Sequence, residues 1–163
     1  MILGIDPGKR GLAIARLLST GEFYDVKCWA LPKDPLTKIA GWGPFVRAHL
    51  QGHGQYTKIV CEQMCYYPQA GSAKSSSEIK AILVLQAIGG LVAGWTGCPN
   101  VIFRPAAAWK SNLPKDICHA RLEKLLSPGE LAAFLTQIAQ YKKQDDCWDS
   151  LGVALSGAGR FRV

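Results

Sequence analysis

Five acidic residues in this chain occur where carboxylates could do metal chemistry. Asp6 ends the apolar run from Ile2 to Ile5, and Glu62 ends a second run, YTKIVCEQ; both runs are typical of buried strands. The other three acids are close together on one expected helix: Asp145, Asp146 and Asp149. A charge beside a buried strand is costly unless a partner compensates it, so Asp6 raises the question of what that partner is.

The chemistry that such a set favours is the binding of divalent cations. If the two strands are neighbours, Asp6 and Glu62 lie together at one edge of a sheet, where open α/β sheets hold ligands. Clustered carboxylates repel one another unless they share protons or bind cations. Oxygen ligands without a histidine cluster suit Mg²⁺ or Mn²⁺ better than zinc. Two such ions, about 4 Å apart, would hold the attacking and leaving oxygens of a phosphodiester.

Each acid taken singly also has a plainer explanation. An Asp after a strand is often a turn former, and acids at a helix start are favoured by the helix dipole. A zinc site is a further alternative, because His49-x₃-His53 and Cys61-x₃-Cys65 roughly resemble ligand spacing. Cys61 belongs to an expected strand, however, so core and loop thiols explain these cysteines better. The combination of acids in a basic chain is what favours a metal site.

The elements that must position these acids follow from the hydrophobic pattern. Strands are expected at 1–6, 10–18, 22–31, 56–63 and over NVIFRP. A first helix is expected at about 37–50, and a second begins at the Ser75-x-x-Glu78 capping box, after a loop at 66–77, and ends at about 95. Two more helices are expected, one that begins at Ser127-Pro128 and one over QDDCWDSLGVAL. The order predicts an α/β domain with a mixed central sheet, antiparallel in the hairpins and parallel across the later crossovers.

Composition narrows the class of protein. With 163 residues, 48% of them apolar and 19% charged, the chain is expected to form one folded domain over 1–163 rather than a disordered segment. The run from Ala81 to Trp95 is too short to span a bilayer, and no signal peptide is evident, so the six cysteines are expected to stay reduced. A net charge of +7 favours a polyanionic partner.

Three motifs carry a resemblance to a known family. The segments ILGIDPG, IVCEQ and DCWDSLGVAL, in this order and spacing, resemble those of RuvC-type Holliday junction resolvases, which are members of the RNase H-like nuclease superfamily; the resemblance covers residues 1–157. It implies an RNase H-like fold with a mixed five-stranded sheet flanked by helices. It also implies a homodimeric, Mg²⁺-dependent endonuclease that resolves four-way DNA junctions by paired phosphodiester nicks.

The same resemblance implies the ligand set. It comprises Asp6, Glu62, Asp146 and Asp149, holding two Mg²⁺ ions per site, for which Mn²⁺ could substitute. At about 100° per residue, Asp145 and Asp146 lie about 40° and 60° from Asp149, so helix geometry alone does not separate them. The D-x-x-D spacing of the family selects Asp146, with Asp145 as the alternate. A metal ion is then the compensating partner of Asp6.

Residues that assist the chemistry are also implied. Lys110 matches a family lysine near the scissile phosphate, and Lys115 is a weaker candidate of the same kind. The family carries an aromatic residue on the loop after Glu62; Cys65 stands at its usual place, so Tyr66 or Tyr67 is expected to contact the junction. Further phosphate contacts are expected from basic residues in predicted loops: Lys9, Arg10, Lys74, Lys142 and Lys143.

Other functions remain open on the sequence alone. The same fold could act on other branched DNA or on RNA. An actin-like ATPase would use DPGKRG as its phosphate turn, but the sequence has no second phosphate loop, and a non-catalytic nucleic-acid-binding module would not need the full set of acids. A nuclease of this kind is expected in the cytoplasm with DNA, or in a host cytoplasm if the source is viral. The apolar helix over 78–95 is the expected dimer element, with no membrane partner.

Overall fold

A five-stranded sheet forms the centre of the computed structural model, which describes residues 1–8, 10–52, 54–63, 76–142 and 144–161. The strands are β1 (Ile2–Pro7), β2 (Gly11–Leu17), β3 (Phe23–Ala30), β4 (Lys58–Gln63) and β5 (Val101–Pro105), in the spatial order β3-β2-β1-β4-β5. The β1–β2 and β2–β3 pairs are antiparallel, and the β1–β4 and β4–β5 pairs are parallel. The mixed sheet expected from the sequence is therefore confirmed.

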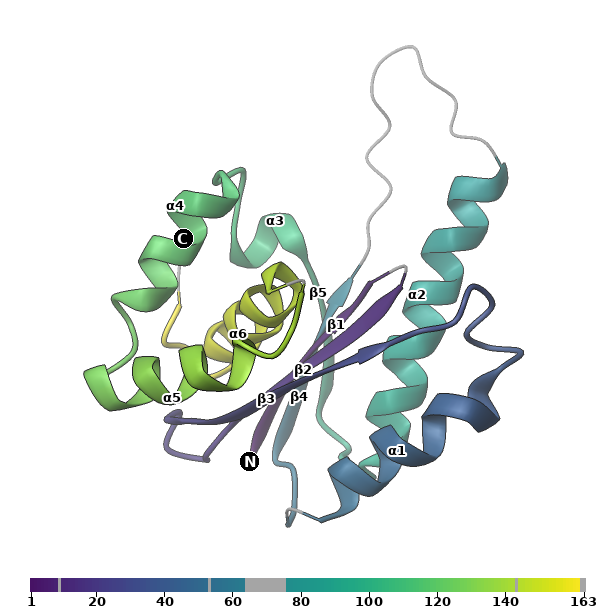
Figure 1. Cartoon of the computed structure of the whole chain (residues 1–163), viewed down its shortest axis with the longest axis horizontal. Coiled ribbons are helices and arrows are strands. Elements are labelled where there is room, and N and C mark those ends of the chain that lie inside the picture. Colours follow the sequence, from purple (N-terminus) through teal and green to yellow (C-terminus); the bar gives the residue numbers. More distant parts are fainter. Residues whose placement is uncertain (9, 53, 64–75, 143, 162–163) are drawn as a thin grey trace.

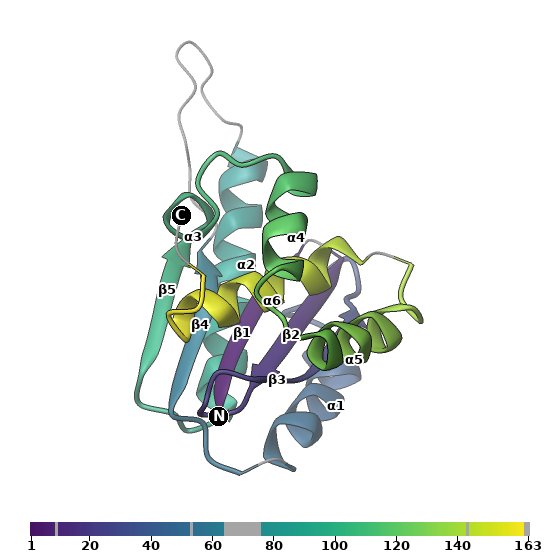
Figure 2. The ribbon, with the colours of Figure 1, turned by 90° about the vertical axis from the view of Figure 1, so that its left-hand side faces the viewer.

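Helices cover both faces of this sheet (Figures 1 and 2). On one face lie α1 (Ile39–Gln51) and α2 (Ser76–Trp95). On the other lies α6 (Asp145–Gly157), accompanied by α3 (Ala106–Trp109), α4 (Lys115–Glu123) and α5 (Pro128–Ile138). The Ser127 capping box confirms the expected start of α5. The expected cap at Ser75 lies outside the described residues. The short helices α3 and α4 were not separately expected, because neither carries a long apolar stripe.

Alternation along the strands divides the core into two parts. Leu3 and Ile5 of β1 pack toward α1 and α2, in a core that includes Trp42, Ile88 and Val92. Ile2 of β1 and Val60 of β4 belong to the opposite core, with α6. Because side chains alternate along a strand, Asp6 and Glu62 follow this second set and point to the face that α6 covers. The two carboxylates thus share one end and one face of the sheet.

The helix α6 lies directly against the sheet because glycines remove side chains at the contacts. A Cβ atom on Gly4 of β1 would stand 2.3 Å from the carbonyl oxygen of Ser150 and 2.6 Å from the nitrogen of Ala154. On the other side of α6, a Cβ on Gly152 would stand 2.2 Å from Cζ3 of Trp109. No side chain larger than hydrogen fits at either contact, so α6 is fixed closely between β1 and α3.

The helix α2 is buried on one side only within this chain, whereas its apolar sequence predicts either burial on two sides or a contact with a second subunit. Leu85, Ile88 and Val92 are buried against the sheet, whereas Ile79 and Leu83 are 48% and 58% exposed. By length and composition alone, its segment Glu78–Trp95 is the one helix among the described residues that could cross a membrane. The core helix of a soluble protein also meets this criterion. The contacts of α2 with β1 and β4 identify it as a layer of the fold with an uncovered apolar face.

Glu130, at the start of α5, joins three parts of the chain on the α6 side of the sheet. Its Oε1 accepts hydrogen bonds from the backbone N–H of Phe23 (2.7 Å) and from Nη1 of Arg160 (2.9 Å), and its Oε2 accepts one from the N–H of Ser127 (2.8 Å). Burial alone would raise the pKa of Glu130, but the hydrogen bonds from Arg160, Phe23 and Ser127 outweigh it and lower the pKa to about 2. The ionised carboxylate is therefore the form that the fold stabilises.

Replacing Glu130 by Gln is expected to lower the free energy of unfolding at pH 7 by about 1–3 kcal/mol, since it removes a charged hydrogen-bond acceptor. The wild-type advantage is fully present above the ordinary glutamate pKa of 4.5 and is lost as pH falls toward about 2. Urea unfolding at several pH values measures the difference. The exposed Glu123→Gln is the control and should change little. A Glu130→Gln deficit that stays constant down to pH 3 would contradict this role.

Candidate active site

Three carboxylates meet at the end of the sheet where β1 and β4 run side by side. Ile5 of β1 pairs with Cys61 of β4, so the next residues, Asp6 and Glu62, are neighbours across the parallel pair. Asp149 reaches the same place from α6, and one carboxylate oxygen of each acid lies within 4.8 Å of the others. Asp6 and Glu62 are buried, and Asp149 is half-buried. The structure thus brings together acids from the beginning, middle and end of the sequence.

Lys110 is the cation that faces these acids. Its Nζ lies 3.0 Å from Oδ1 of Asp149 and 3.6 Å from Oε1 of Glu62. The side chain of the preceding residue, Trp109, is buried against Gly152 of α6, which sets the position of Lys110. The chain then turns away through Ser111, whose φ of 53° lies in the left-handed region. Lys110 is therefore held at the acidic cluster by its neighbours on both sides.

Burial and mutual repulsion act on the charges of the cluster. Burial is the main reason that the pKa of Asp6 is raised well above its ordinary value, and the charges of Glu62 and Asp149 add to the effect. Burial likewise raises the pKa of Glu62 to about 7, against the opposing charge of Lys110. Burial would lower the pKa of Lys110, but Glu62 and Asp149 outweigh it and the pKa is raised. Burial and repulsion therefore favour the protonated forms of Asp6 and Glu62, and Lys110 offsets only part of this effect.

The remaining two acids of α6 lie in different places. Asp146 is half-buried, and its Oδ2 lies 3.0 Å from where a Cβ on Gly11 would be, against the turn between β1 and β2. Its charge contributes to the raised pKa of Asp6. Asp145 is exposed and its Oδ2 lies 3.0 Å from Nζ of Lys115. Asp146 therefore lies against the β1–β2 turn and affects Asp6 by its charge without joining the tight group of three, and Asp145 pairs with a surface lysine.

The other expected site residues are only partly within the described structure. Arg10 and Lys142 are exposed and line one cavity with Asp146 and Cys28, whereas Lys115 is paired with Asp145. Outside the described residues lie Lys9, Tyr66, Tyr67, Lys74 and Lys143. For the zinc alternative, Cys61 is buried against Gly89 of α2, on the face of the sheet opposite to the carboxylates; His53 and Cys65 lie outside the described residues.

Sequence reasoning missed the residues that place the site rather than form it. Trp109 was not singled out, although its packing on Gly152 fixes Lys110. The signal available was the combination of a tryptophan beside the candidate lysine and a glycine within the apolar stripe of the last helix. Cys28 of β3 was also missed; its Sγ lies 2.6 Å from that of Cys147, which neighbours Asp146 on α6. The five described cysteines are free thiols.

The donor set of this cluster fits a hard divalent cation. All three clustered side chains are carboxylates, which are the ligands that Mg²⁺ and Mn²⁺ prefer. Oε2 of Glu62 is buried and accepts no hydrogen bond from any described residue. A buried carboxylate oxygen without a partner is costly, and a bound cation would satisfy it. Asp6, Glu62 and Asp149 are therefore the residues that could hold a metal ion here.

The sheet order, the mixed strand directions and the helices on both faces define an RNase H-like fold. The solved structures with this arrangement include RuvC of Thermus thermophilus. RuvC in complex with a Holliday junction substrate matches at a TM-score of 0.58 and 16% identity, over 96% of this chain and 92% of RuvC. A second RuvC structure from this organism matches at a TM-score of 0.54 and 17% identity over the same shares. At these identities the likeness shows a shared fold. No family model and no curated protein matches the sequence.

Asp6→Asn is expected to raise the melting temperature at pH 8 without added metal, because it removes one of several buried like charges. A gain of 1 kcal/mol corresponds to about 2–4 °C for a chain of this size. Added Mn²⁺ should stabilise the wild type through binding and leave Asp6→Asn unchanged. Thermal unfolding with and without Mn²⁺ measures both effects, and the exposed Asp145→Asn should behave as wild type. A variant that is less stable than wild type without metal, or equally stabilised by Mn²⁺, would refute the assignment.

Proposed function

We propose that this chain is an endodeoxyribonuclease that resolves four-way DNA junctions by paired, Mg²⁺-dependent phosphodiester nicks. The observation that carries the proposal is the cluster of Asp6, Glu62 and Asp149 at the ends of parallel strands within a RuvC-like fold. A RuvC structure that holds a Holliday junction substrate supports this substrate class. Residues 1–163 would form one nuclease domain, working in the cytoplasm with DNA or in a host cytoplasm if the source is viral.

Each acidic residue has a role in this proposal. Asp6, Glu62 and Asp149 would hold divalent cations together with Asp146, which lies on α6 against the β1–β2 turn and contributes to the raised pKa of Asp6. When bound, two Mg²⁺ ions supply an activated water and neutralise charge on the scissile phosphate; Mn²⁺ would substitute for them. Burial of Asp6 and Glu62 keeps bulk water from competing for these ligands.

Lys110 assists by charge. Its ammonium group lies within 4 Å of both Glu62 and Asp149, so it compensates them in the absence of cations. Once cations neutralise those carboxylates, the same ammonium is available to stabilise negative charge that develops on the phosphate. Its contact with the Trp109 ring, 4.8 Å from the ring centroid, keeps it oriented toward the site.

The basic residues would hold the DNA backbone. Arg10, Lys115 and Lys142 are exposed, and Arg10 and Lys142 flank Asp146. Contacts with phosphates give affinity that depends on salt and little on sequence. The same role is proposed for residues outside the described structure: Lys9, Lys74 and Lys143, with Tyr66 or Tyr67 stacking on a base at the branch.

A homodimer would place two such sites on one junction. The uncovered face of α2 is the proposed contact: Ile79 and Leu83 are exposed on it, and Phe103 of β5, 42% exposed, lies beside its Gly90. Two copies related by a two-fold axis would each bury this face against the other. Small residues such as Gly90 would let the two helices approach closely.

Incubation with a labelled four-way junction and a matched linear duplex tests the proposal. We expect paired nicks in the junction with Mg²⁺ or Mn²⁺, and binding with little cleavage in Ca²⁺, because Ca²⁺ accepts irregular coordination that suits catalysis poorly. Flap DNA and an RNA duplex are the matched alternatives. Equal cleavage of linear duplex would reject junction selectivity, and undiminished nicking in excess chelator would reject the metal mechanism.

Asp146→Asn and Asp149→Asn are each expected to abolish junction cleavage while leaving junction binding intact or tighter. Asn keeps the size of Asp and one oxygen acceptor but removes the charge that holds a divalent cation. Asp145→Asn is the control: this exposed residue pairs with Lys115, so most activity should remain. Single-turnover cleavage and gel-shift affinity measure the two effects. An inactive Asp145→Asn together with an active Asp146→Asn would show that Asp145, not Asp146, is the metal ligand. Normal cleavage by all three variants would refute the proposed nuclease function.

A further inference from the structure

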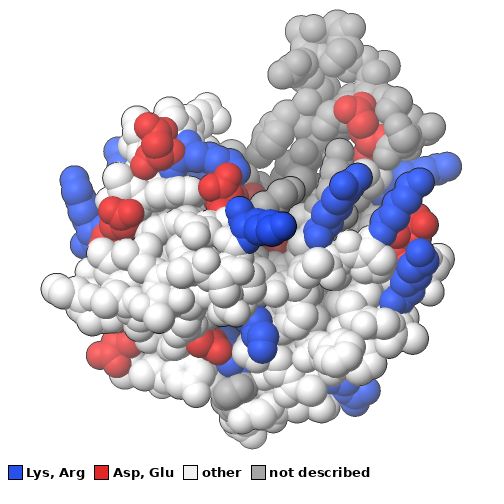
Figure 3. All heavy atoms as spheres, in the orientation of Figure 1, with Lys and Arg blue, Asp and Glu red and all other residues white. Residues whose placement is uncertain are grey.

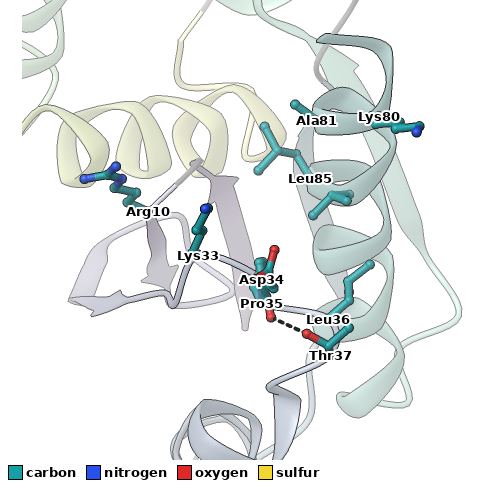
Figure 4. Close-up of a pocket in the computed structure, with 10 residues that line it drawn as sticks. Arg10, Lys33, Asp34, Pro35, Leu36, Thr37, Lys80, Ala81 and Leu85 are labelled. Carbon is teal, nitrogen blue, oxygen red and sulfur yellow. Dashed lines mark hydrogen bonds between the residues drawn. The ribbon is translucent and has the colours of Figure 1, made fainter. Parts of the chain in front are cut away.

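A cleft of about 500 Å³ lies between α2 and the segment that joins β3 to α1 (Figure 4). Its floor is apolar, with Ala81, Val84 and Leu85 from α2 and Pro35 from the joining segment. The volume lies within the range of about 300–1,000 Å³ that is usual for small-ligand sites. None of the residues in the acidic cluster lines it, so it is a separate feature of the surface.

The wall of the cleft is held in place by its own hydrogen bonds. The N–H of Leu31 donates to the carbonyl oxygen of Arg10 (2.9 Å), which ties the end of β3 to the β1–β2 turn. The indole Nε1 of buried Trp42 donates to the carbonyl oxygen of Pro35 (2.8 Å). The hydroxyl of Thr37 donates to the carbonyl oxygen of Asp34 (3.0 Å), as Figure 4 shows. The cleft is therefore formed before any ligand binds, which lowers the entropic cost of binding.

The rim of the cleft is strongly cationic. Arg10, Lys33 and Lys80 line it, against a single carboxylate, that of Asp34. All three cations are exposed, and none forms an ion pair or hydrogen bond through its side chain with another described residue. Figure 3 shows Lys and Arg side chains gathered on this side of the molecule, where α2 and the joining segment lie. An apolar floor beneath unpaired cations suits a ligand with a flat apolar part and a negative charge.

We propose that this cleft binds one unpaired nucleotide of the DNA substrate, with its base on the apolar floor and its phosphates against the cationic rim. The inference rests on the proposed nuclease function and adds a second DNA contact to it. Arg10 links the cleft to the active site, because it follows the turn after β1, the strand that carries Asp6. A DNA strand that leaves the acidic cluster past Arg10 would reach the cleft next. Bases that are unstacked at a branch are the ones available to enter such a pocket.

Binding of a labelled four-way junction and of a labelled ten-nucleotide thymidine strand, both in Ca²⁺, tests this inference. Combined Lys33→Gln and Lys80→Gln should weaken binding of both probes about tenfold and lower the slope of log affinity against log salt by about two, one for each lost phosphate contact. Ala81→Trp, which fills the floor, should weaken binding of both probes to a similar extent without changing that slope. Lys124→Gln, an exposed lysine at the end of α4, is the matched control.

Three results would overturn the proposal. The first is binding by the double lysine variant that equals binding by Lys124→Gln. The second is wild-type affinity of a folded Ala81→Trp, with an unchanged melting temperature, since the cleft would then hold phosphate without a base. The third is displacement of the labelled strand by free thymidine monophosphate at concentrations near the affinity of the strand, which would make the ligand a free nucleotide. Failure of the wild type to cleave junctions while it still binds the strand would instead reject the nuclease function and leave the cleft in place.

Discussion

The close approach of α6 to β1 is the contact on which the acidic cluster depends. Asp6 and Glu62 are fixed by the parallel pairing of β1 and β4, but Asp149 reaches them only because α6 lies against the sheet with no side chain between. Gly4 permits this approach, since a methyl group there would collide with the backbone of α6. The packing of a helix on a strand therefore sets the spacing between carboxylates.

A cluster of like charges opposes the packing that creates it. Burial and repulsion both disfavour ionised Asp6 and Glu62, and one lysine offsets only part of this cost. The stability of the rest of the fold must therefore exceed the strain of the site. Two apolar cores, one on each face of the sheet, provide that stability. β1 contributes side chains to both cores, and every position of β1 before Asp6 is buried.

Much of this arrangement could be predicted from the sequence. Apolar runs that end on acids predicted both strands, and they placed the two acids at one edge on the condition that the strands are neighbours. The parallel pairing of β1 and β4 meets that condition, and its register, with the period of two along a strand, puts Asp6 and Glu62 on one face. Local sequence could not separate Asp145 from Asp146, because both lie close to Asp149 around a helix. Their different surroundings arise from tertiary contacts: Lys115 on α4 faces one, and the β1–β2 turn faces the other. The cleft beside α2 was also invisible, since its cations come from three segments far apart in sequence.

The order of the elements along the chain has a consequence for synthesis. Asp6 and Glu62 emerge from the ribosome well before Asp149, and the face of the sheet that they share stays uncovered until α6 is made. A chain that ends before α6 has two of the three clustered carboxylates. It lacks both the helix that covers them and the ion pair between Lys110 and Asp149. The addition of α6 therefore completes both the three-carboxylate cluster and the hydrophobic core on that face of the sheet. Under the proposed nuclease function, the active site of a nascent chain stays incomplete until the last helix has been made.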